Sequence, residues 1–384
     1  MTLPAHSPLG ASSAERWMNC VGSTALIKKL TLPDTDEPDY RAEGTAAHEK
    51  LAKCLEQGLD AWEIAGETAS NGVAVTPAMV DAIQAFIDIA RPLMAGARKV
   101  YIEHQLSAPG FHPLFYGTVD FAVQHGIAGS LLDVLDFKYG EGVIVEAHEN
   151  PQIMYYAYGI LRDHPEIDRV RMQIVQPRIT WNKDEPYEIT ANALREWAEG
   201  TLRPAMERAD RDNGPLEAGE WCRFCPAKLV CPLLTHLFGA AATANPKEVV
   251  EFDDAAVDRN YPLIAPVEHY LKALKGEAFN RVAAGKQFEK IKLVQKKANR
   301  VFHPGAEAVF KSKFGDDAYT KPELKSPAVM EELGEVAKSL VREYAFTPES
   351  GLTVALKTDK RPEVKVQSVA QAFAGVAPKV GDDE

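Results

Sequence analysis

The sequence has few cysteines, no long apolar run and a shortage of positive charge, and each limits what the protein can be. Only five of the 384 residues are cysteine. In a reducing intracellular compartment such thiols stay free, so we expect no disulfide framework. No apolar run approaches the length that spans a bilayer, and the N-terminal segment lacks the basic and apolar regions of a signal peptide. We therefore expect a cytoplasmic globular protein with no membrane partner.

The formal net charge of −12 argues against a uniformly basic surface that coats nucleic acid. The total charge does not describe a single groove, however, because a local basic strip can still guide a phosphate backbone. A nuclease also concentrates carboxylates where it holds metal ions. With 384 residues, 46% of them hydrophobic, the chain can bury one large core or a core with an appendage.

Hydrophobic periodicity predicts alternating helices and strands over the first part of the chain. Helical segments are expected at 11–30, 41–58, 77–92 and 191–210, with Thr76 as one N-cap. Strand-like segments lie at 98–107, 114–124, 130–140 and 169–179, and a helix that begins after Asn150 precedes the last of them. The strand, helix, strand order implies a parallel crossover, and therefore an α/β fold with a mixed sheet.

Charged side chains interrupt the strand-like segments. Asp120 lies inside GTVDFAV, and Asp136 and Lys138 close the very apolar segment LLDVLDFK. Two carboxylates on neighbouring strands repel each other unless a divalent cation lies between them, so the pair predicts a site for Mg²⁺ or Mn²⁺. Lys138 shares a strand face with Asp136, where it would orient an attacking water or stabilise negative charge on a phosphate.

Four other residues are candidates for the same site. Gln152 and Tyr156 lie four residues apart on one face of the next helix, so both can reach one phosphate. His48, from an earlier helix, is a candidate nitrogen ligand, and Glu103 is a further carboxylate. The ordinary alternatives are a surface salt bridge at the strand end, an exposed helix face and a structural histidine.

The order of these motifs resembles the RecB-type branch of the PD-(D/E)XK nucleases. The matching residues, within roughly 11–235, are Gly44, Thr45 and His48; Gly117 and Asp120; Asp136 and Lys138; and Gln152 with Tyr156. The resemblance implies a restriction-endonuclease-like mixed sheet flanked by helices, with His48, Asp120 and Asp136 binding the metal. It also implies that Lys138 is the catalytic lysine and that Gln152 and Tyr156 complete the catalytic set and contact DNA. Phe137 departs mildly from the family, which often has tyrosine there.

Four of the five cysteines suit a shared metal centre. Cys222-x2-Cys225-x5-Cys231 places three thiolates in one compact loop, and a fourth ligand is then required. Cys20 is the better candidate, because Cys54 is spaced on its helix as a small hydrophobe beside two leucines. Spacing alone fits zinc as well as an iron–sulfur cluster, and a set of buried free cysteines is the other alternative.

The cysteine pattern resembles the iron–sulfur staple of AddB-type and CRISPR-adaptation exonucleases. The resemblance implies a four-iron, four-sulfur cluster, in a mainly structural role, held by Cys20, Cys222, Cys225 and Cys231. Because the cross-link closes a very long loop, the metal should contribute to folding. The C-x3-C-x2-C spacing of radical enzymes is absent, which argues against a radical or redox centre.

The composition of the sequence changes after about residue 236. We expect a nuclease core with its iron–sulfur staple at 1–235 and a mainly helical, basic region without an assigned role at 236–384. Between Lys272 and Lys313, lysines and arginines outnumber glutamates eleven to three. These cations would track phosphates or form an ordinary solvated helix face. The candidate DNA contacts in this stretch are Lys290, Lys292, Lys296, Lys297 and Arg300.

The sequence therefore predicts a metal-dependent deoxyribonuclease in which one or two Mg²⁺ or Mn²⁺ ions activate water for phosphodiester hydrolysis. By resemblance it is an exonuclease of phage-type recombination or DNA processing. The segment TDKRPEVKV near the C-terminal end resembles a region of uncharacterised phage and prophage proteins that share the nuclease core, and its function does not follow from that. Expected partners are single- or double-stranded DNA and a recombination or single-strand-binding protein, in the bacterial cytosol if the gene is phage-encoded. The alternative is a non-catalytic iron–sulfur DNA-binding or assembly module on the same fold.

Overall fold

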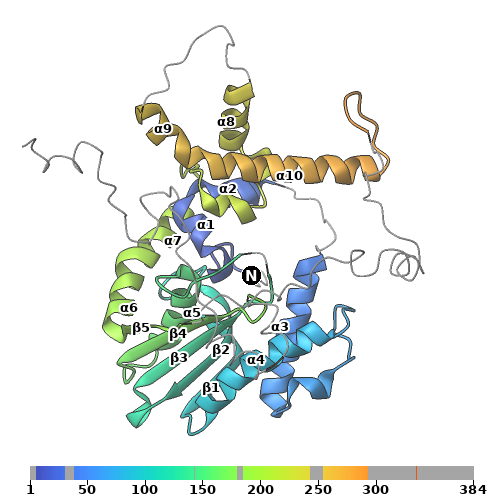
Figure 1. Ribbon diagram of the computed structural model, residues 1–384. Coiled ribbons are helices and arrows are strands. Elements are labelled where there is room, and N and C mark those ends of the chain that lie inside the picture. Colours follow the sequence, from blue (N-terminus) through green and yellow to red (C-terminus); the bar gives the residue numbers. More distant parts are fainter. Residues whose placement is uncertain are drawn as a thin grey trace, which may run out of the picture. The chain divides into compact units, whose positions relative to one another are not determined.

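A five-stranded mixed sheet organises the protein (Figure 1). The computed structural model describes residues 6–30, 39–141, 143–179, 185–242, 254–292 and 334. The strands, in spatial order, are β1 (Lys99–Ser107), β2 (Tyr116–His125), β3 (Leu131–Phe137), β4 (Arg169–Val175) and β5 (Tyr187–Thr190). Neighbouring strands are antiparallel except β3 and β4, which run parallel. The predicted α/β class and the parallel crossover are confirmed.

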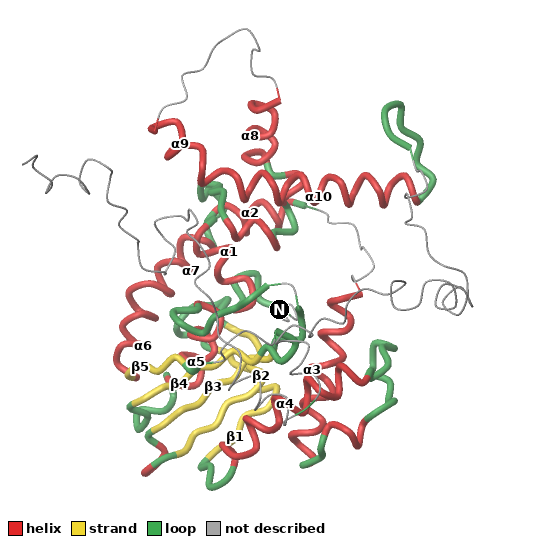
Figure 2. The backbone as a smooth tube through the Cα atoms, viewed as in Figure 1, coloured by secondary structure: helices red, strands yellow, loops and turns green. Residues whose placement is uncertain are grey.

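Helices surround the sheet and form a second group around the cysteines. The helices that contact the sheet or follow it are α3 (Asp39–Gln57), α4 (Pro77–Met94), α5 (Pro151–Leu161), α6 (Ala191–Trp197) and α7 (Arg203–Ala209). The others are α1 (Ala14–Asn19), α2 (Gly22–Lys29), α8 (Pro232–Ala242), α9 (Asp254–Asn260) and α10 (Ile264–Ala283). Figure 2 shows the strands, in yellow, among these helices, in red. None of the described helices has the length and apolar character needed to cross a bilayer.

Both faces of the sheet are covered because alternate side chains of each strand enter different cores. On one face, Phe86 of α4 packs edge to face on Phe121 and Phe137, with ring centroids 6.0 and 5.5 Å apart. On the other, Tyr155 of α5 stacks on Phe115 at 4.1 Å. The strand that closes with Asp136 and Lys138 therefore lies between two helical layers.

The two predicted N-caps are confirmed. The Thr76 hydroxyl accepts a hydrogen bond from the backbone N–H of Met79 at 3.2 Å. The Asn150 side chain accepts from the N–H of Gln152 at 2.9 Å, which fixes the start of α5 directly after β3 and its loop. Helix α5 therefore presents Gln152 in its first turn, near the end of β3.

The predicted boundary after residue 235 falls inside α8. Leu234 and Phe238 of this helix are apolar at helical spacing and pack beside the cysteine loops. Phe238 also contacts Tyr270 of α10, with ring centroids 5.5 Å apart. The four-residue strand β5 was not predicted. Lys296, Lys297, Arg300 and the segment TDKRPEVKV lie outside the described residues.

Candidate metal centre and cysteine cage

Three side chains from α3, β1 and β2 converge to form a possible cation site. His48, Glu103 and Asp120 each offer a ligand atom, and these atoms lie within 4.8 Å of one another. His48 Nδ1 is 3.6 Å from Glu103 Oε1 and 3.6 Å from Asp120 Oδ1. Within the described part of the chain, no other group of three histidine, cysteine or acidic side chains meets this limit. One nitrogen and two carboxylate oxygens suit a divalent cation.

Strand β1 is distorted where it supplies Glu103. The neighbouring pairs Ile102 with Phe121 and His104 with Val119 keep a constant register, but Glu103 itself has a φ of +42°. This left-handed conformation is unfavourable for a side chain with a Cβ atom, and such strain persists mainly at functional sites. The distortion lies at the residue whose carboxylate reaches His48.

Asp120 is fixed by the next strand. Its Oδ2 accepts a 2.8 Å hydrogen bond from the backbone N–H of Phe137. The antiparallel register of β2 and β3 pairs Phe121 with Leu135, so one further step brings Asp120 opposite Asp136. The structure therefore brings together the two aspartates that the sequence placed on neighbouring strands.

Asp136 lies next to this group and is held by two partners. It is 1% exposed, its Oδ2 lies 2.7 Å from Lys138 Nζ, and its Oδ1 accepts a 2.9 Å hydrogen bond from Gln152 Nε2. Burial raises the pKa of Asp136, Lys138 opposes this, and the nearby Asp120 charge raises it further. Burial lowers the pKa of Lys138, but Asp136 and Asp120 raise it by more, so Lys138 is a cation.

His48 is the titratable ligand of the group. Burial lowers its pKa, but the carboxylates of Asp120 and Glu103 outweigh burial, and also the opposing charge of Lys138, to raise it to about 9. A histidine that binds a metal must present an unprotonated nitrogen. A divalent cation at this site would therefore compete with a proton on His48.

Gln152 and Tyr156 differ in their exposure to the site. Gln152 lines the groove described below, whereas the Tyr156 ring is 8% exposed and does not. Burial, together with Asp136 and Asp120, raises the pKa of Tyr156 well above its ordinary value, so its hydroxyl stays neutral. The ring also lies against Gly117, where an added Cβ would sit 3.6 Å from Tyr156 Cε1. Tyr156 is thus a buried, neutral neighbour of the carboxylates and does not line the groove as Gln152 does.

The candidate centre opens into a groove that residues from several separate elements line. His48, Glu103, Lys138 and Gln152 all line it. Its other lining segments come from α3, from the loop after β3, from the cysteine loops and from α10. Lys290 and Lys292, two of the predicted DNA contacts, are exposed but do not line this groove.

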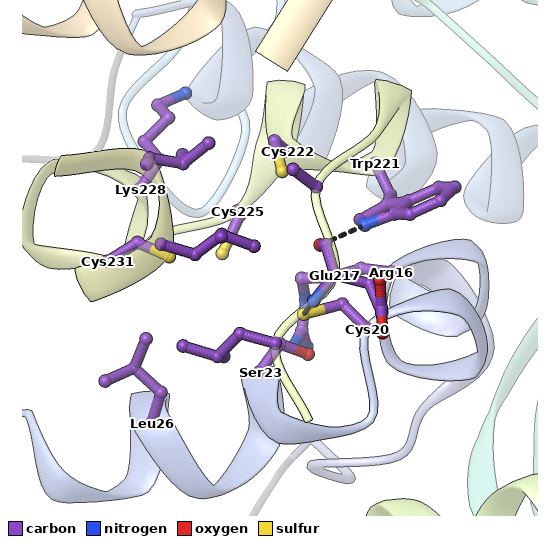
Figure 3. Close-up of a pocket in the computed structure, with 14 residues that line it drawn as sticks. Arg16, Cys20, Ser23, Leu26, Glu217, Trp221, Cys222, Cys225, Lys228 and Cys231 are labelled. Atoms are coloured by element: carbon purple, nitrogen blue, oxygen red, sulfur yellow. Dashed lines mark hydrogen bonds between the residues drawn. The ribbon is translucent and has the colours of Figure 1, made fainter. Parts of the chain in front are cut away.

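Four cysteines surround a second, smaller cavity (Figure 3). Cys20 follows α1, and Cys222, Cys225 and Cys231 belong to the loops before α8; the figure shows their sulfur atoms directed into a common space. Cys54 is fully buried in the core beside α4, as its spacing predicted. The structure therefore brings together the four cysteines that the sequence assigned to one site despite their long separation along the chain.

The chemistry of the cavity suits thiolates bound to a metal. Burial raises the pKa of Cys20, and that of Cys222 to about 11, so these thiols lose their protons at neutral pH only if a cation compensates. The backbone N–H of Glu217 donates to Cys20 Sγ at 3.3 Å. Burial lowers the pKa of the Arg16 guanidinium, while nearby Cys225 and Cys20 oppose this shift.

A close backbone contact holds the two halves of the cage together. The N–H of Gly22 donates to the carbonyl oxygen of Pro215 at 2.7 Å. A Cβ atom at position 22 would lie 2.4 Å from the carbonyl oxygen of Gly214. Glycine is thus required two residues after Cys20, and sequence reasoning did not identify this position.

Comparison with solved structures gives a weak likeness. A solved chain described as "Crystal structure of SSO0001" aligns at 12% identity with a TM-score of 0.20, over 55% of this chain and 94% of that chain. A likeness at this level carries no argument about fold or function. A family model, in contrast, matches residues 6–362. The protein therefore belongs to the family described as "Protein of unknown function (DUF2800)".

Proposed function

We propose that the protein is a metal-dependent nuclease that hydrolyses phosphodiester bonds in DNA. The observation that carries the proposal is the juxtaposition of His48, Glu103 and Asp120 with the buried ion pair of Asp136 and Lys138, at a groove that His48, Glu103 and Lys138 line. Carboxylates, one imidazole and one lysine are the groups that metal-assisted phosphoryl chemistry uses. An ordinary surface salt bridge would not be 1% exposed at its acidic partner.

His48, Glu103 and Asp120 would hold Mg²⁺ or Mn²⁺. Asp136 remains a further candidate ligand, because apart from the ion pair with Lys138 its Oδ2 has no hydrogen-bond partner among the described residues. A cation there would polarise a phosphate oxygen and lower the pKa of a coordinated water. The cation would also relieve the repulsion between the carboxylates of Asp120 and Asp136.

The remaining residues act on the phosphate and on one another. Lys138 is protonated, so it stabilises negative charge that develops on the phosphate instead of accepting a proton. Asp136 positions the Lys138 ammonium, and Gln152 fixes the other oxygen of Asp136. The neutral Tyr156 hydroxyl adds no charge beside these carboxylates.

We further propose that Cys20, Cys222, Cys225 and Cys231 hold a four-iron, four-sulfur cluster. The convergence of four cysteines on one cavity supports a shared metal centre, and the resemblance of their spacing to iron–sulfur nucleases favours a cluster over a lone zinc. Its role would be structural, because it joins the residue after α1 to the loops before α8. By the resemblance in motif order, the setting is exonucleolytic DNA processing in phage-type recombination.

The direct test is digestion of end-labelled single- and double-stranded linear DNA in Mg²⁺, in Mn²⁺ and in chelator. We expect metal-dependent cleavage by the wild-type protein and at least about 100-fold less by Lys138→Ala. Lys29→Ala, purified identically, is the control for contaminating nucleases, because Lys29 is exposed and outside the groove. DNA binding without cleavage in either metal would favour the non-catalytic module.

A further inference from the structure

Besides Lys53, which pairs with Glu67, four cations line the groove with the candidate metal centre but take no part in it. They are Arg41 of α3, Arg223 and Lys228 of the cysteine loops, and Lys272 of α10. None of the four forms an ion pair with a residue that the structure describes. Because they come from three separate segments, the fold, and not one basic helix face, gathers them.

Three of these cations, Arg41, Lys228 and Lys272, bring like charges to the lining of one groove. Lys228 Nζ donates a hydrogen bond to the carbonyl oxygen of Arg223, which leaves its charge uncompensated. Clustered cations of this kind are stabilised by an anion with several negative groups, such as a polynucleotide backbone.

An exposed aromatic ring lies beside these cations. Phe224 lines the groove and is 63% exposed, an unusual state for a phenylalanine. The Arg223 guanidinium lies 5.6 Å from the ring centroid. Cys222 and Cys225 flank this pair, and the Cys225 N–H donates to the Cys222 carbonyl oxygen at 3.2 Å, so the loop presents the ring from a fixed backbone.

We propose that this wall of the groove binds single-stranded nucleic acid. Arg41, Lys228 and Lys272 bind phosphates of the strand, and Phe224, with Arg223 beside it, stacks on an unpaired base. The inference rests on the proposed nuclease function, because it names the form of strand that reaches the metal centre. A paired base in a duplex is already stacked on both faces and offers no face to Phe224.

Binding without cleavage tests the proposal. The probes are fluorescent oligonucleotides of one sequence, as single-stranded DNA, single-stranded RNA and blunt duplex DNA, titrated in chelator with the full chain. We expect Phe224→Ala to weaken single-strand binding about tenfold and to leave duplex binding unchanged. Phe224→Trp should restore the affinity. Trp62→Ala is the matched control, because Trp62 is 60% exposed and outside the groove.

The cations are tested by the dependence of affinity on salt. Loss of two phosphate contacts in the double variant Arg41→Ala/Lys272→Ala should reduce the single-strand salt slope by about 1.4. The double variant Lys29→Ala/Arg208→Ala removes two exposed cations outside the groove and should leave the slope unchanged. Neither substituted cation in the test variant belongs to the cysteine loops, so this arm does not depend on folding of the cage.

Three outcomes would overturn the inference: unchanged single-strand affinity in Phe224→Ala, an equal loss with the duplex, or an equal loss in Trp62→Ala. Tight binding of either the DNA or the RNA strand through Phe224 supports it, and the stronger arm identifies the natural strand. The nuclease proposal fails separately. A protein that binds single strands through Phe224 but cleaves no DNA in Mg²⁺ or Mn²⁺ refutes that proposal and leaves this inference standing.

Discussion

The backbone N–H of Phe137 donates a 2.8 Å hydrogen bond to Asp120 Oδ2, so a side chain of β2 is fixed by the backbone of β3. The other oxygen, Oδ1, lies 3.6 Å from His48 Nδ1. One carboxylate group therefore joins the sheet to the candidate metal ligands. Its charge and its capacity to accept the hydrogen bond can be separated by substitution.

Asp120→Asn keeps an acceptor for the Phe137 N–H but removes the charge. We expect a loss of cleavage of at least about 100-fold and weaker Mn²⁺ binding, measured by calorimetry, with little change in the thermal unfolding midpoint. Asp120→Ala should also lower the midpoint, because the Phe137 N–H loses its partner. Equal activity of Asp120→Asn and the wild-type protein would remove Asp120 from the site.

The stability of the metal-free protein should depend on pH through His48. Its folded pKa of about 9 exceeds the ordinary 6.5, so the stabilisation is complete below pH 6.5 and is lost as the pH rises through 9. The free energy of unfolding should fall by at most about 3 kcal/mol over this range. The measurement is urea unfolding in chelator, and His48→Gln should remove this part of the pH dependence.

Metal affinity should have the opposite dependence on pH. Because a cation displaces the proton from His48, Mn²⁺ affinity should rise by up to about tenfold per pH unit below pH 9. Titrations between pH 6 and pH 8 would measure this slope, with His48→Gln as the control. A wild-type affinity that does not change with pH would show that His48 is not a ligand.

Substitution of cysteines separates the cage from the core. Cys20→Ala should abolish iron binding and the absorbance near about 400 nm, whereas Cys54→Ala should keep both, because Cys54 is buried beside α4. Metal analysis of anaerobically purified protein is the measurement. A colourless protein with one zinc per chain would contradict the proposed cluster and keep a cysteine-bound metal.

Gly22→Ala should disrupt the cage without removing a ligand. Its new methyl group would lie 2.4 Å from the backbone oxygen of Gly214, so α2 must shift away from that segment. We expect a loss of about 2 kcal/mol in stability and a reduced metal content. Gly200→Ala, where the added methyl group meets no atom within 4 Å, is the control and should be nearly neutral.

The part of the site that follows strand periodicity could be predicted from the sequence. Asp120, Asp136 and Lys138 interrupt apolar strands, and consecutive antiparallel strands bring such interruptions together. Glu103 could be named only as a further candidate, because its left-handed backbone breaks the alternation that places side chains on a strand. Whether these residues bind a metal remains a prediction.

Long-range features gave uneven signals. The spacing of Cys222, Cys225 and Cys231 marks a shared site, and the need for a fourth ligand pointed to Cys20. No spacing in the sequence identifies the cations of the groove. Arg41 and Lys228 lie in unrelated segments, and only the fold brings them to one groove. The boundary placed after residue 235 lies inside α8, because the change in composition there does not coincide with the end of the helix that carries Leu234 and Phe238.

Cys225 and Lys228 line both the cysteine cavity and the groove, so one short loop borders both. If the proposed cluster and the proposed binding wall are both correct, oxidation of the cysteines should weaken binding of a polynucleotide without removing the carboxylates. A small chromogenic phosphodiester that does not reach Phe224 should then still be hydrolysed by air-exposed protein that no longer degrades long strands.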